Sequence, residues 1–379
     1  MAGNANTGPT MKLTLRTDDF ESFFAAPFAA YGPQSPYISP LKSDLRRFVN
    51  SAANPLFQDS GSAISIFTGH RGTKVVGRIS AHVHAASNRA HGLQRGYFGY
   101  FDCIDDDQTA RSLLGAAEDW VRARGLTEIA GNFNLTAMQQ IGVMTDGFAQ
   151  PPYTDQVWSP PHIAQRLAEN GYGAEFGMTT FEVDLRRADP PATGPKQQAI
   201  LDNPDFTFAP ISRGTIPQRM EEARLILNAS FARNPMFVPV TAEEFHFQAR
   251  DMKWVMDPRI SAVLHHKGRP AACIICIPDL NPLLRRINSR IGLTTPWHFL
   301  RQRMTNRRCI LIFSGVIPEL QGQGVNPVVL RRVMLAMRDA GYDTCGNTWI
   351  ADVNGPSLAQ KEKAGANPMH RLHLFRKSL

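Results

Sequence analysis

Cysteine is scarce in this sequence, and its pattern does not suit a disulfide framework. The 379 residues contain five cysteines, an odd number in a long chain, so we expect free thiols and a reducing compartment, the cytoplasm. Cys273 and Cys276 form a CxxC within the apolar run AACIICI, which predicts a strand. Residues three apart on a strand point to opposite faces, so we predict neither a metal site nor a redox-active pair.

Long hydrophobic runs are missing as well. No stretch reaches the ~20 apolar residues that cross a bilayer, and the start MAGNANTGPT has neither the charged nor the apolar region of a signal peptide. We therefore expect no transmembrane helix and no leader. Charged residues make up 20% of the chain and hydrophobic residues 43%, which is typical of a folded globular protein.

Acidic charge is in deficit, because 41 Lys and Arg face 33 Asp and Glu, a net charge of +8. The basic residues are dispersed along the chain. Such a charge favours a polyanionic partner, whether a phosphorylated cofactor, an anionic membrane surface or nucleic acid. No nucleic-acid-reading module accompanies the arginines, so nucleic acid is the least favoured of the three.

The length predicts two domains, since a single core rarely exceeds roughly 250–300 residues. The Pro-rich text around 187–210 has the composition of a linker, which leaves domains at 1–186 and 211–379. Both domains show the same predicted order of hairpin, strand, helix, strand and helix, and this order indicates a duplication. In the second domain we predict a strand at 309–316, a helix at 327–340, a strand at 344–352 and a helix at 356–364.

The most informative segment is CILIFSGVIPELQGQGVNPVV, residues 309–329. An apolar strand runs into a turn containing Gly322 and Gly324, after which Asn326 and Pro327 begin a helix. Such a turn lets consecutive N–H groups face outward beside the positive end of the helix dipole, which suits phosphate oxygens. The segment has neither a nucleotide-triphosphate loop nor a GxGxxG motif, and a tight turn without a ligand remains the alternative.

The same turn resembles motif A of the GNAT acyltransferase superfamily, Q/R-x-x-G-x-G/A. Gln321 and Gly324 occupy their places in the motif, while Asn326 replaces the last small residue. The later segment WIADVN, with Ser357 and EKAGA after it, is similar to the superfamily's N-x-x-A…E-K-x-G-F block. Its spacing is one residue longer, and the tyrosine that often acts as general acid there is replaced around Lys361.

The rest of the chain is similar to a bacterial group of GNAT-like acyltransferases, through NPLF at 54–57, VGRI at 76–79 and GYFGYF at 96–101. Some members of this group act as ceramide synthases. The resemblance implies an α+β fold of two tandem GNAT-like domains, each a mixed, mostly antiparallel sheet flanked by helices. It also implies an N-acyltransferase that uses acyl-CoA as a co-substrate, with no tightly bound cofactor, and acylates an amine such as a lipid sphingoid base.

The resemblance further implies where acyl-CoA binds. The pyrophosphate would rest on backbone amides of the turn, and pantetheine would run beside the preceding strand like an added strand. A backbone N–H near Val316 or Ile317 would polarise the thioester carbonyl. The CoA-binding residues are thus expected to be Ser314, Val316, Ile317, Gln321, Gly322, Gln323, Gly324, Val325, Asn326, Asn354 and Ser357.

The reaction needs a base, because an amine with a pKa of about 10 is protonated at pH 7. The candidates are Asp352 at a strand end, Asp279 after CIICIP, and His298 in a basic insert. Each has a structural alternative as well: a solvated cap for Asp352, turn chemistry for Asp279 and packing for His298.

The N-terminal domain lacks the glycine turn. Asp105, Asp106 and Asp107 follow its strand GYFGYFDC, where their charge would repel CoA; a plain helix cap is the alternative. We expect this domain to bind the acceptor or to be a structural partner. The residues expected around a cleft between the domains are Asn132, Asn134, Asp146, Tyr153 and Trp158.

The basic insert at 281–308 mixes arginines with apolar residues. It predicts either peripheral contact with an anionic membrane, with Trp297 at the interface, or core packing with a solvated basic face. Two other functions stay open: a Fem-type aminoacyltransferase using aminoacyl-tRNA, and a non-catalytic acyl-CoA-binding protein. The complete glycine turn favours acyl-CoA over aminoacyl-tRNA.

Overall fold

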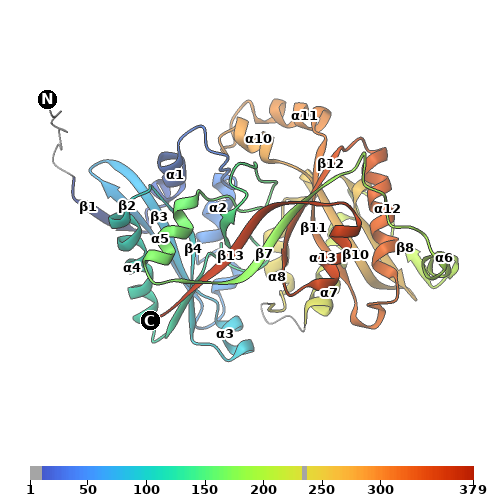
Figure 1. The fold of residues 1–379 in the computed structure, drawn as a ribbon, viewed down its shortest axis with the longest axis horizontal. Helices are drawn as coiled ribbons and strands as arrows, with labels where there is room; N and C mark the ends of the chain where they lie inside the picture. The colour runs from blue at the N-terminus through green and yellow to red at the C-terminus, as the bar shows by residue number, and fades with distance from the viewer. Residues whose placement is uncertain (1–10, 233–236) are drawn as a thin grey trace.

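The computed structural model describes residues 11–232 and 237–379, and Figure 1 shows the two halves of the chain side by side along the long axis. The strands are β1 Leu13–Thr17, β2 Ala63–Arg71, β3 Lys74–Val83, β4 Arg95–Cys103, β5 Glu128–Gly131, β6 Val143–Asp146, β7 Gly173–Asp184, β8 Phe206–Phe208, β9 Ala262–His266, β10 Arg269–Pro278, β11 Arg308–Val316, β12 Thr344–Ala351 and β13 Asn367–Ser378.

The longer helices are α1 Phe20–Tyr31, α2 Lys42–Val49, α3 Ala85–His91, α4 Asp107–Arg122, α5 Pro161–Glu169, α6 Pro195–Asp202, α7 Ile216–Phe231, α8 Ala242–Ala249, α9 Met252–Val255, α10 Asn281–Arg286, α11 Thr295–Thr305, α12 Val325–Asp339 and α13 Gly355–Lys363. Single 3-10 turns lie at η1 Pro55–Phe57, η2 Pro258–Ile260 and η3 Pro318–Leu320. The four elements that we predicted in the second domain are present, each with ends within two residues of the expected ones.

The described strands form one mixed sheet in the order β1-β2-β3-β4-β5-β13-β7-β12-β11-β10-β9-β8, with β6 paired to β13. Its pairs are antiparallel except for β4 with β5 and β11 with β12. Each half therefore repeats an antiparallel hairpin followed by a parallel pair, and a helix, α4 or α12, connects the two parallel strands. The predicted internal duplication is visible in this order.

The two halves exchange strands at the middle of the sheet. β7, from the first half, pairs with β12, while β13, the last strand of the chain, crosses back to pair with β5 and β6. Figure 1 shows β7 and β13 running together across the centre. The predicted linker at 187–210 holds α6 and β8, and β8 pairs with β9 at the far edge. The predicted second domain, 211–379, therefore ends in a strand, β13, that pairs with strands of the first half.

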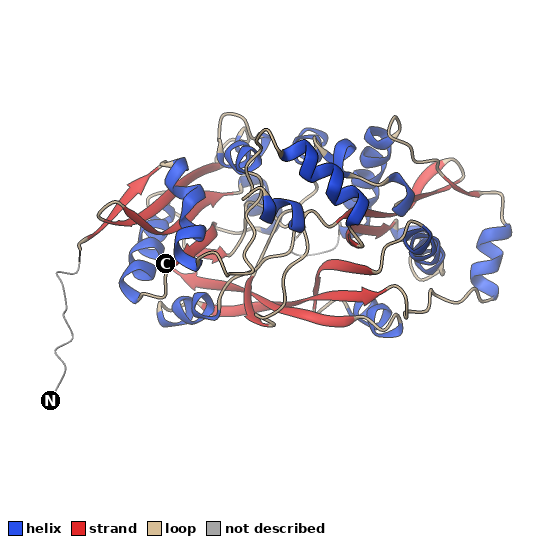
Figure 2. Cartoon of the chain, turned by 90° about the horizontal axis from the view of Figure 1, so that it is seen from above, coloured by secondary structure: helices blue, strands red, loops and turns tan. Residues whose placement is uncertain are grey.

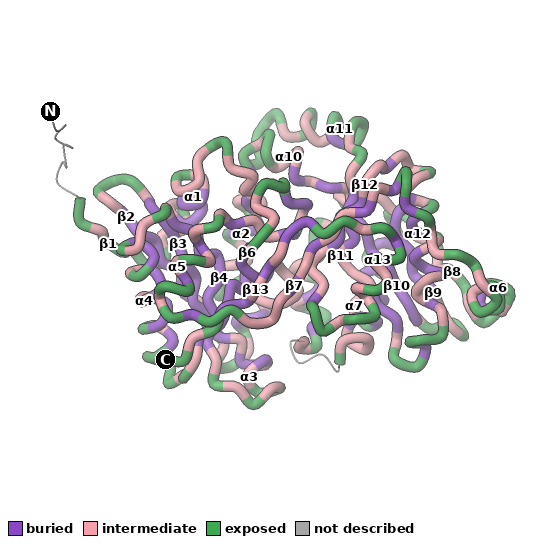
Figure 3. Tube along the Cα trace, viewed as in Figure 1, coloured by how far each residue is buried: buried purple, intermediate pink, exposed green. Residues whose placement is uncertain are grey.

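Helices cover both faces of the sheet, as the view from above in Figure 2 makes clear. In the second half, α12 packs one core on one face and α7 packs another on the opposite face. Cys276 belongs to the first core and Cys273 to the second, so the CxxC pair does lie on opposite faces as predicted. The buried segments in Figure 3 follow the strands, whereas α6 and much of α11 are exposed.

The α12 helix forms where its apolar residues recur at helical spacing. Val325, Val329, Val333 and Met337 are all nearly inaccessible to solvent and lie on one stripe. Among residues 11–232 and 237–379, no helix has both the length and the apolar composition that crossing a membrane requires.

Candidate active site

The parallel strands β11 and β12 diverge halfway along their length. They pair only from Arg308 opposite Thr344 to Leu311 opposite Asn347. Beyond that point β11 stays with β10, and β12 stays with β7. The second half of β11 therefore has no neighbouring strand on its β12 side, which leaves backbone groups of β11 facing the divergence.

The hydrogen bonding between β10 and β11 identifies which backbone groups of β11 face the divergence. The N–H of Ile317 donates to the carbonyl of Ala271 across 2.9 Å. Because backbone groups alternate in direction along an antiparallel strand, those of Val316 and Ser314 point away from β10. The carbonyl of Val316 already accepts from Ser230 Oγ at 2.7 Å and from Gln321 Nε2 at 2.9 Å. Of the two expected oxyanion donors, Ile317 is engaged in the sheet, and the geometry favours the Val316 N–H.

The glycine turn follows β11 directly. Gly322 and Gly324 have φ values of 73° and 90°, the left-handed region that side chains disfavour. Gly324 is also the N-cap of α12, so no side chain caps the first-turn N–H groups of that helix. The side chain of Gln323 turns back to Glu319 O. The N–H groups of Gln321 and Gln323 donate within the turn, to Pro318 O at 3.3 Å and to Leu320 O at 3.4 Å, so the amides left for a phosphate are the other ones of the turn and those at the start of α12.

Two neighbouring helices flank this turn, whose residues Gln321, Gly322 and Gln323 are exposed. A Cβ placed on Gly324 would lie 2.9 Å from Gln197 Nε2 of α6, so the expected linker covers the turn. From the other side, Asn326 Nδ2 donates to Gln360 Oε1 of α13 at 2.9 Å. The residue that departs from motif A thus joins the start of α12 to α13, and the expected CoA-binding residue Val325 is buried beneath them.

Helix α13 carries a lysine that the sequence prediction did not include among the catalytic candidates. Asn354 caps this helix by accepting from Ser357 N at 3.3 Å. Two residues before the helix ends, Lys361 Nζ donates to Asn347 Oδ1 at 2.8 Å. Burial lowers the pKa of Lys361, against the opposing effect of nearby thiols, first that of Cys345. The position of Lys361 in the second motif, where the tyrosine is missing, was the available signal.

Asp352, the first predicted base, is tied to an arginine. Its two oxygens accept from Arg371 of β13 at 2.6 and 2.5 Å, and this hydrogen bonding lowers the pKa of the carboxyl group. The pair lies directly over Gly177, where a Cβ would contact both partners. A carboxylate held in this way is a poor proton acceptor, so the geometry argues against Asp352 as the base.

Asp279 and His298 lie at the other end of β11. Asp279 is buried and accepts from Thr154 N and Oγ1 at 3.0 and 2.9 Å and from Arg308 Nε at 3.0 Å. His298 lies on α11, which also precedes Arg308. At ~3.3 Å per strand residue, Arg308 and Val316 are about 25 Å apart. The structure therefore does not bring either residue to the diverging end, and Asp279 instead holds a loop of the first half.

In the first half, the corresponding divergence is filled by side chains of the chain itself. β4 and β5 pair only as far as Tyr97 opposite Ala130. Beyond this, Asn134 Oδ1 accepts from the N–H of Tyr100 at 2.8 Å, and Asn132 Oδ1 accepts from that of Phe101 at 3.2 Å. These amides occupy the strand edge where a second pantetheine would bind. Together with Trp158, the two asparagines line only a small cavity of about 30 Å³.

The acidic triplet of the first half acts at the start of α4. Asp106 caps this helix, accepting from Thr109 N at 2.8 Å, and Asp105 and Asp107 form ion pairs with arginines. The helix end that would face a pyrophosphate is therefore occupied by a carboxylate. Asp106 is thus a helix cap, as the alternative interpretation stated. Because this cap is a carboxylate, it also repels an anion from the start of α4.

The other three residues expected around the cleft are Tyr153, Trp158 and Asp146, and each forms hydrogen bonds within the protein. Tyr153 is buried against Gly346 of β12, and its hydroxyl donates to Glu182 and contacts Thr344 Oγ1 at 2.8 Å. Trp158 Nε1 donates to Phe148 O at 3.0 Å, and Asp146 accepts from the N–H of Gly147 at 2.7 Å. These contacts position the Pro-rich loop between the halves.

The basic insert forms α10 and α11 at the top of Figure 1. Arg285 donates to the carbonyls of Ser35 and Pro36 at 3.0 and 2.9 Å, which fastens α10 to the first half. On α11, Trp297, Leu300 and Met304 expose 68%, 52% and 74% of their surface. Their spacing places them on one side of the helix, so this part of the insert is not packed in a core.

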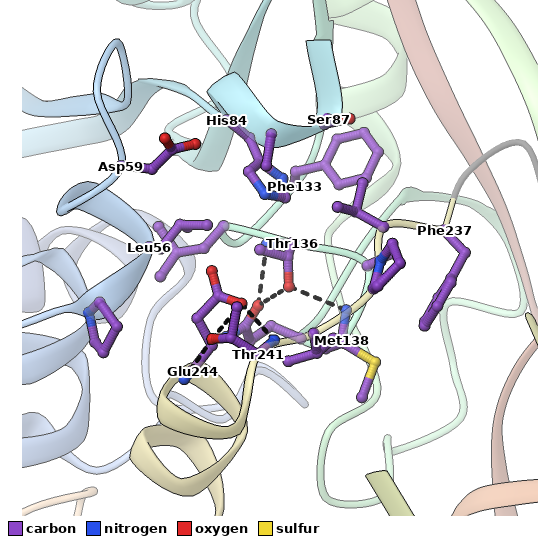
Figure 4. A pocket seen from close by; sticks show the side chains of 18 of the residues that line it. Leu56, Asp59, His84, Ser87, Phe133, Thr136, Met138, Phe237, Thr241 and Glu244 are labelled. Atoms are coloured by element: carbon purple, nitrogen blue, oxygen red, sulfur yellow. Dashed lines mark hydrogen bonds between the residues drawn. The ribbon is translucent and has the colours of Figure 1, made fainter. Parts of the chain in front are cut away.

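A cavity of about 320 Å³ lies between the two halves. Figure 4 shows Leu56, His84 and Phe133 of the first half facing Thr241 and Glu244 of the second. Its floor and walls are mainly apolar, and its lining includes Leu56, Tyr97, Phe133, Leu135, Met138 and Phe237.

Comparisons with known proteins place this geometry in context. No family model matches the sequence. "Protein YghO" of Escherichia coli K12 is 26% identical over 378 residues, covering 97% of this chain and 95% of that protein. A protein named "Bacterial ceramide synthase" from Caulobacter vibrioides is 24% identical over 369 residues, covering 95% of each chain.

Among solved structures, a tandem GNAT protein from the clavulanic acid biosynthesis pathway matches 97% of this chain and 98% of its own, with a TM-score of 0.56 and 15% identity. A GCN5-related N-acetyltransferase from Sphaerobacter thermophilus matches 97% and 95%, with a TM-score of 0.51 and 11% identity. The expected α+β class with two tandem GNAT-like domains is confirmed by these likenesses.

Proposed function

The chain has the tandem GNAT fold, and from this premise we propose that it is an acyl-CoA-dependent N-acyltransferase with one CoA site, in its second half. The observation that carries the proposal is the contrast between the two halves. Both contain diverging parallel strands, yet β4 is blocked by Asn132 and Asn134, whereas β11 keeps its backbone facing the divergence and ends in an uncapped glycine turn.

The proposed chemistry follows from the positions around the divergence. The amine nitrogen attacks the thioester carbonyl, and the Val316 N–H stabilises the negative oxygen that forms. When the C–S bond breaks, the ammonium of Lys361 gives its proton to the CoA thiolate. The lowered pKa of Lys361 makes this transfer easier. The neutral lysine then takes the surplus proton from the attacking nitrogen, which leaves a neutral amide and restores the ammonium. Since Asp352, Asp279 and His298 are placed elsewhere, we propose that the amine loses its proton to water before it attacks.

We further propose a lipid amine as the acceptor and an anionic membrane as a peripheral partner. The name of the Caulobacter relative supports a lipid amine, and the apolar side of α11, flanked by Arg301 and Arg303, supports the membrane contact. This patch is at the start of β11, the end away from the glycine turn. Membrane attachment and CoA binding are therefore separate properties and can be tested separately.

A matched pair of glycine substitutions tests the CoA site. Gly324→Val introduces a Cβ at the turn, whereas Gly268→Val introduces the same strain at φ 76° in the β9–β10 hairpin, where nothing lies within 4 Å. In calorimetric titrations with CoA, we expect Gly324→Val to lose affinity at least tenfold and Gly268→Val to bind like wild type. Equal affinity of a folded Gly324→Val protein would refute the site.

A further inference from the structure

Helix α8 connects the cavity between the halves to β11. Glu243 and Glu244 of its first turn line the cavity, and the ring of the next residue, Phe245, lies 5.8 Å from that of Phe313 on β11. On another wall, Phe237 lies 5.7 Å from Phe231 of α7. Phe231 follows Ser230, whose hydroxyl donates to the Val316 carbonyl. Elements that line the cavity thus also pack against β11 and against the residue next to Ser230.

The walls of this cavity suit a hydrocarbon chain. Tyr97 and Phe133 pack edge to face at 5.1 Å on the side of the first half, and Leu56, Leu135 and Met138 complete the apolar surface. A volume of about 320 Å³ is at the lower end of the range of small-molecule sites, roughly 300–1,000 Å³. A hydrocarbon chain would gain from such a surface by leaving water.

The charges at the cavity favour a cation. Glu243 is exposed and Glu244 half-buried at the start of α8. Within residues 11–232 and 237–379, neither carboxylate forms an ion pair with a lysine or arginine, and Glu244 accepts only from Thr241. On the opposite wall, both lining arginines are paired with carboxylates, Arg89 with Asp59 at 2.6 Å and Arg95 with Glu128 at 2.7 Å. Burial lowers the pKa of His84 to about 4, so this side chain adds no positive charge at neutral pH.

From this arrangement we infer that the cavity binds the alkyl chain of a long-chain primary amine, with the ammonium group directed to Glu243 and Glu244. The inference deepens the proposed N-acyltransferase function and rests on it for the identity of the acceptor. The amine would enter with its charge paired at α8 and give up a proton before attack. The cavity would then select acceptors by chain length, while the glycine turn binds CoA whatever the acceptor.

Filling the cavity tests this inference. Ala137→Trp puts a large ring into the lining, and Ala123→Trp makes the same change at an exposed position after α4. The probe is dodecylamine, below its micelle concentration, with butylamine and laurate as controls. We expect wild type and Ala123→Trp to bind dodecylamine at least tenfold more tightly than butylamine or laurate, and Ala137→Trp to lose this preference while its CoA affinity is unchanged.

A second variant tests whether the hydrocarbon chain in the cavity belongs to the amine acceptor or to the acyl donor. Glu243→Gln with Glu244→Gln keeps the capping hydrogen bond to Thr241 possible but removes both charges, so dodecylamine binding should fall severalfold. Tighter binding of laurate than of dodecylamine would assign the cavity to the acyl donor and overturn the inference. Equal binding of dodecylamine by all variants would overturn it too. Dodecylamine binding without any acyl transfer would leave the cavity assignment standing and refute the proposed function.

Discussion

The ammonium of Lys361 donates to the side-chain oxygen of Asn347 at the last paired position before β11 and β12 diverge. Asn347 therefore holds the lysine at the start of the divergence. Its backbone carbonyl is held from the other side by Gln156 Nε2 at 2.6 Å. A loop of the first half thus supports the proposed proton donor of the second, and catalysis would then depend on the contact between the halves.

Lys361→Met should lower kcat by at least tenfold with little change in CoA affinity, because the thiolate loses its proton donor. In wild type, activity should fall as pH rises through the lowered pKa of Lys361, below the usual lysine value of 10.5. That alkaline limb should be absent in Lys361→Met. Lys361→Tyr should recover part of the rate and Lys361→Arg should not, since arginine scarcely releases its proton. A pH profile unchanged in Lys361→Met would assign the lysine a structural role.

Asp352→Asn should leave the rate within about threefold of wild type. The pair with Arg371 is partly exposed and contributes about 0–1 kcal/mol of stability. Because hydrogen bonding depresses the pKa of Asp352 below 3.8, its contribution is present above that pH and is lost as pH falls through the depressed value. Urea unfolding at pH 7 and pH 3 measures this. A hundredfold loss of kcat would restore Asp352 as the base.

Asp279→Asn should destabilise the protein more than Asp352→Asn does, by about 2 kcal/mol, because it weakens buried hydrogen bonds to Thr154 and the contact with Arg308. Denaturant midpoints of the two variants, measured side by side, give the comparison. A midpoint for Asp279→Asn equal to that of wild type would contradict the structural role described above.

One CoA should bind per chain, since only the second half keeps its strand edge and turn available. Calorimetry should give a stoichiometry of one, and Gly324→Val should abolish the whole signal. If the titration instead shows two sites, or if Gly324→Val leaves one intact, then the asparagines and Asp106 of the first half do not exclude CoA.

Liposome flotation should detect reversible binding to anionic vesicles. Each arginine near such a surface contributes about 1 kcal/mol, and the attraction should weaken in salt as the Debye length falls from ~10 Å at 0.1 M to ~3 Å at 1 M. A triple change to Ser at Trp297, Leu300 and Met304 should remove binding. The matched control changes the exposed apolar residues Leu201, Leu225 and Leu335 to Ser.

Arg285 is unsuitable for a charge-removal variant, because it fastens α10 to the first half. Binding that persists in the α11 triple variant, or absence of binding in wild type at low salt, would rule out α11 as a membrane contact. The CoA site would be unaffected by either result.

The sequence by itself determined the local pieces of this protein. The strand at 308–316, the glycine turn and the helix at 325–339 follow one another along the chain, and their signals (apolar alternation, two glycines and helical spacing) act between near neighbours. The duplicated order of elements and the likeness to the GNAT fold were predictable for the same reason. The capping of α13 is local as well, because Asn354 and Ser357 are three residues apart.

Only the tertiary structure decided which distant groups meet. β13 returns to β5 across more than two hundred residues, Asn132 and Asn134 fill one divergence, and Asp279 binds Thr154 of the other half. None of these partners is marked by local spacing, because a carboxylate or an amide has the same chemistry whether it caps a turn, pairs with an arginine or meets a substrate. Burial and long-range strand pairing select among these roles, and they arise only when the chain has folded.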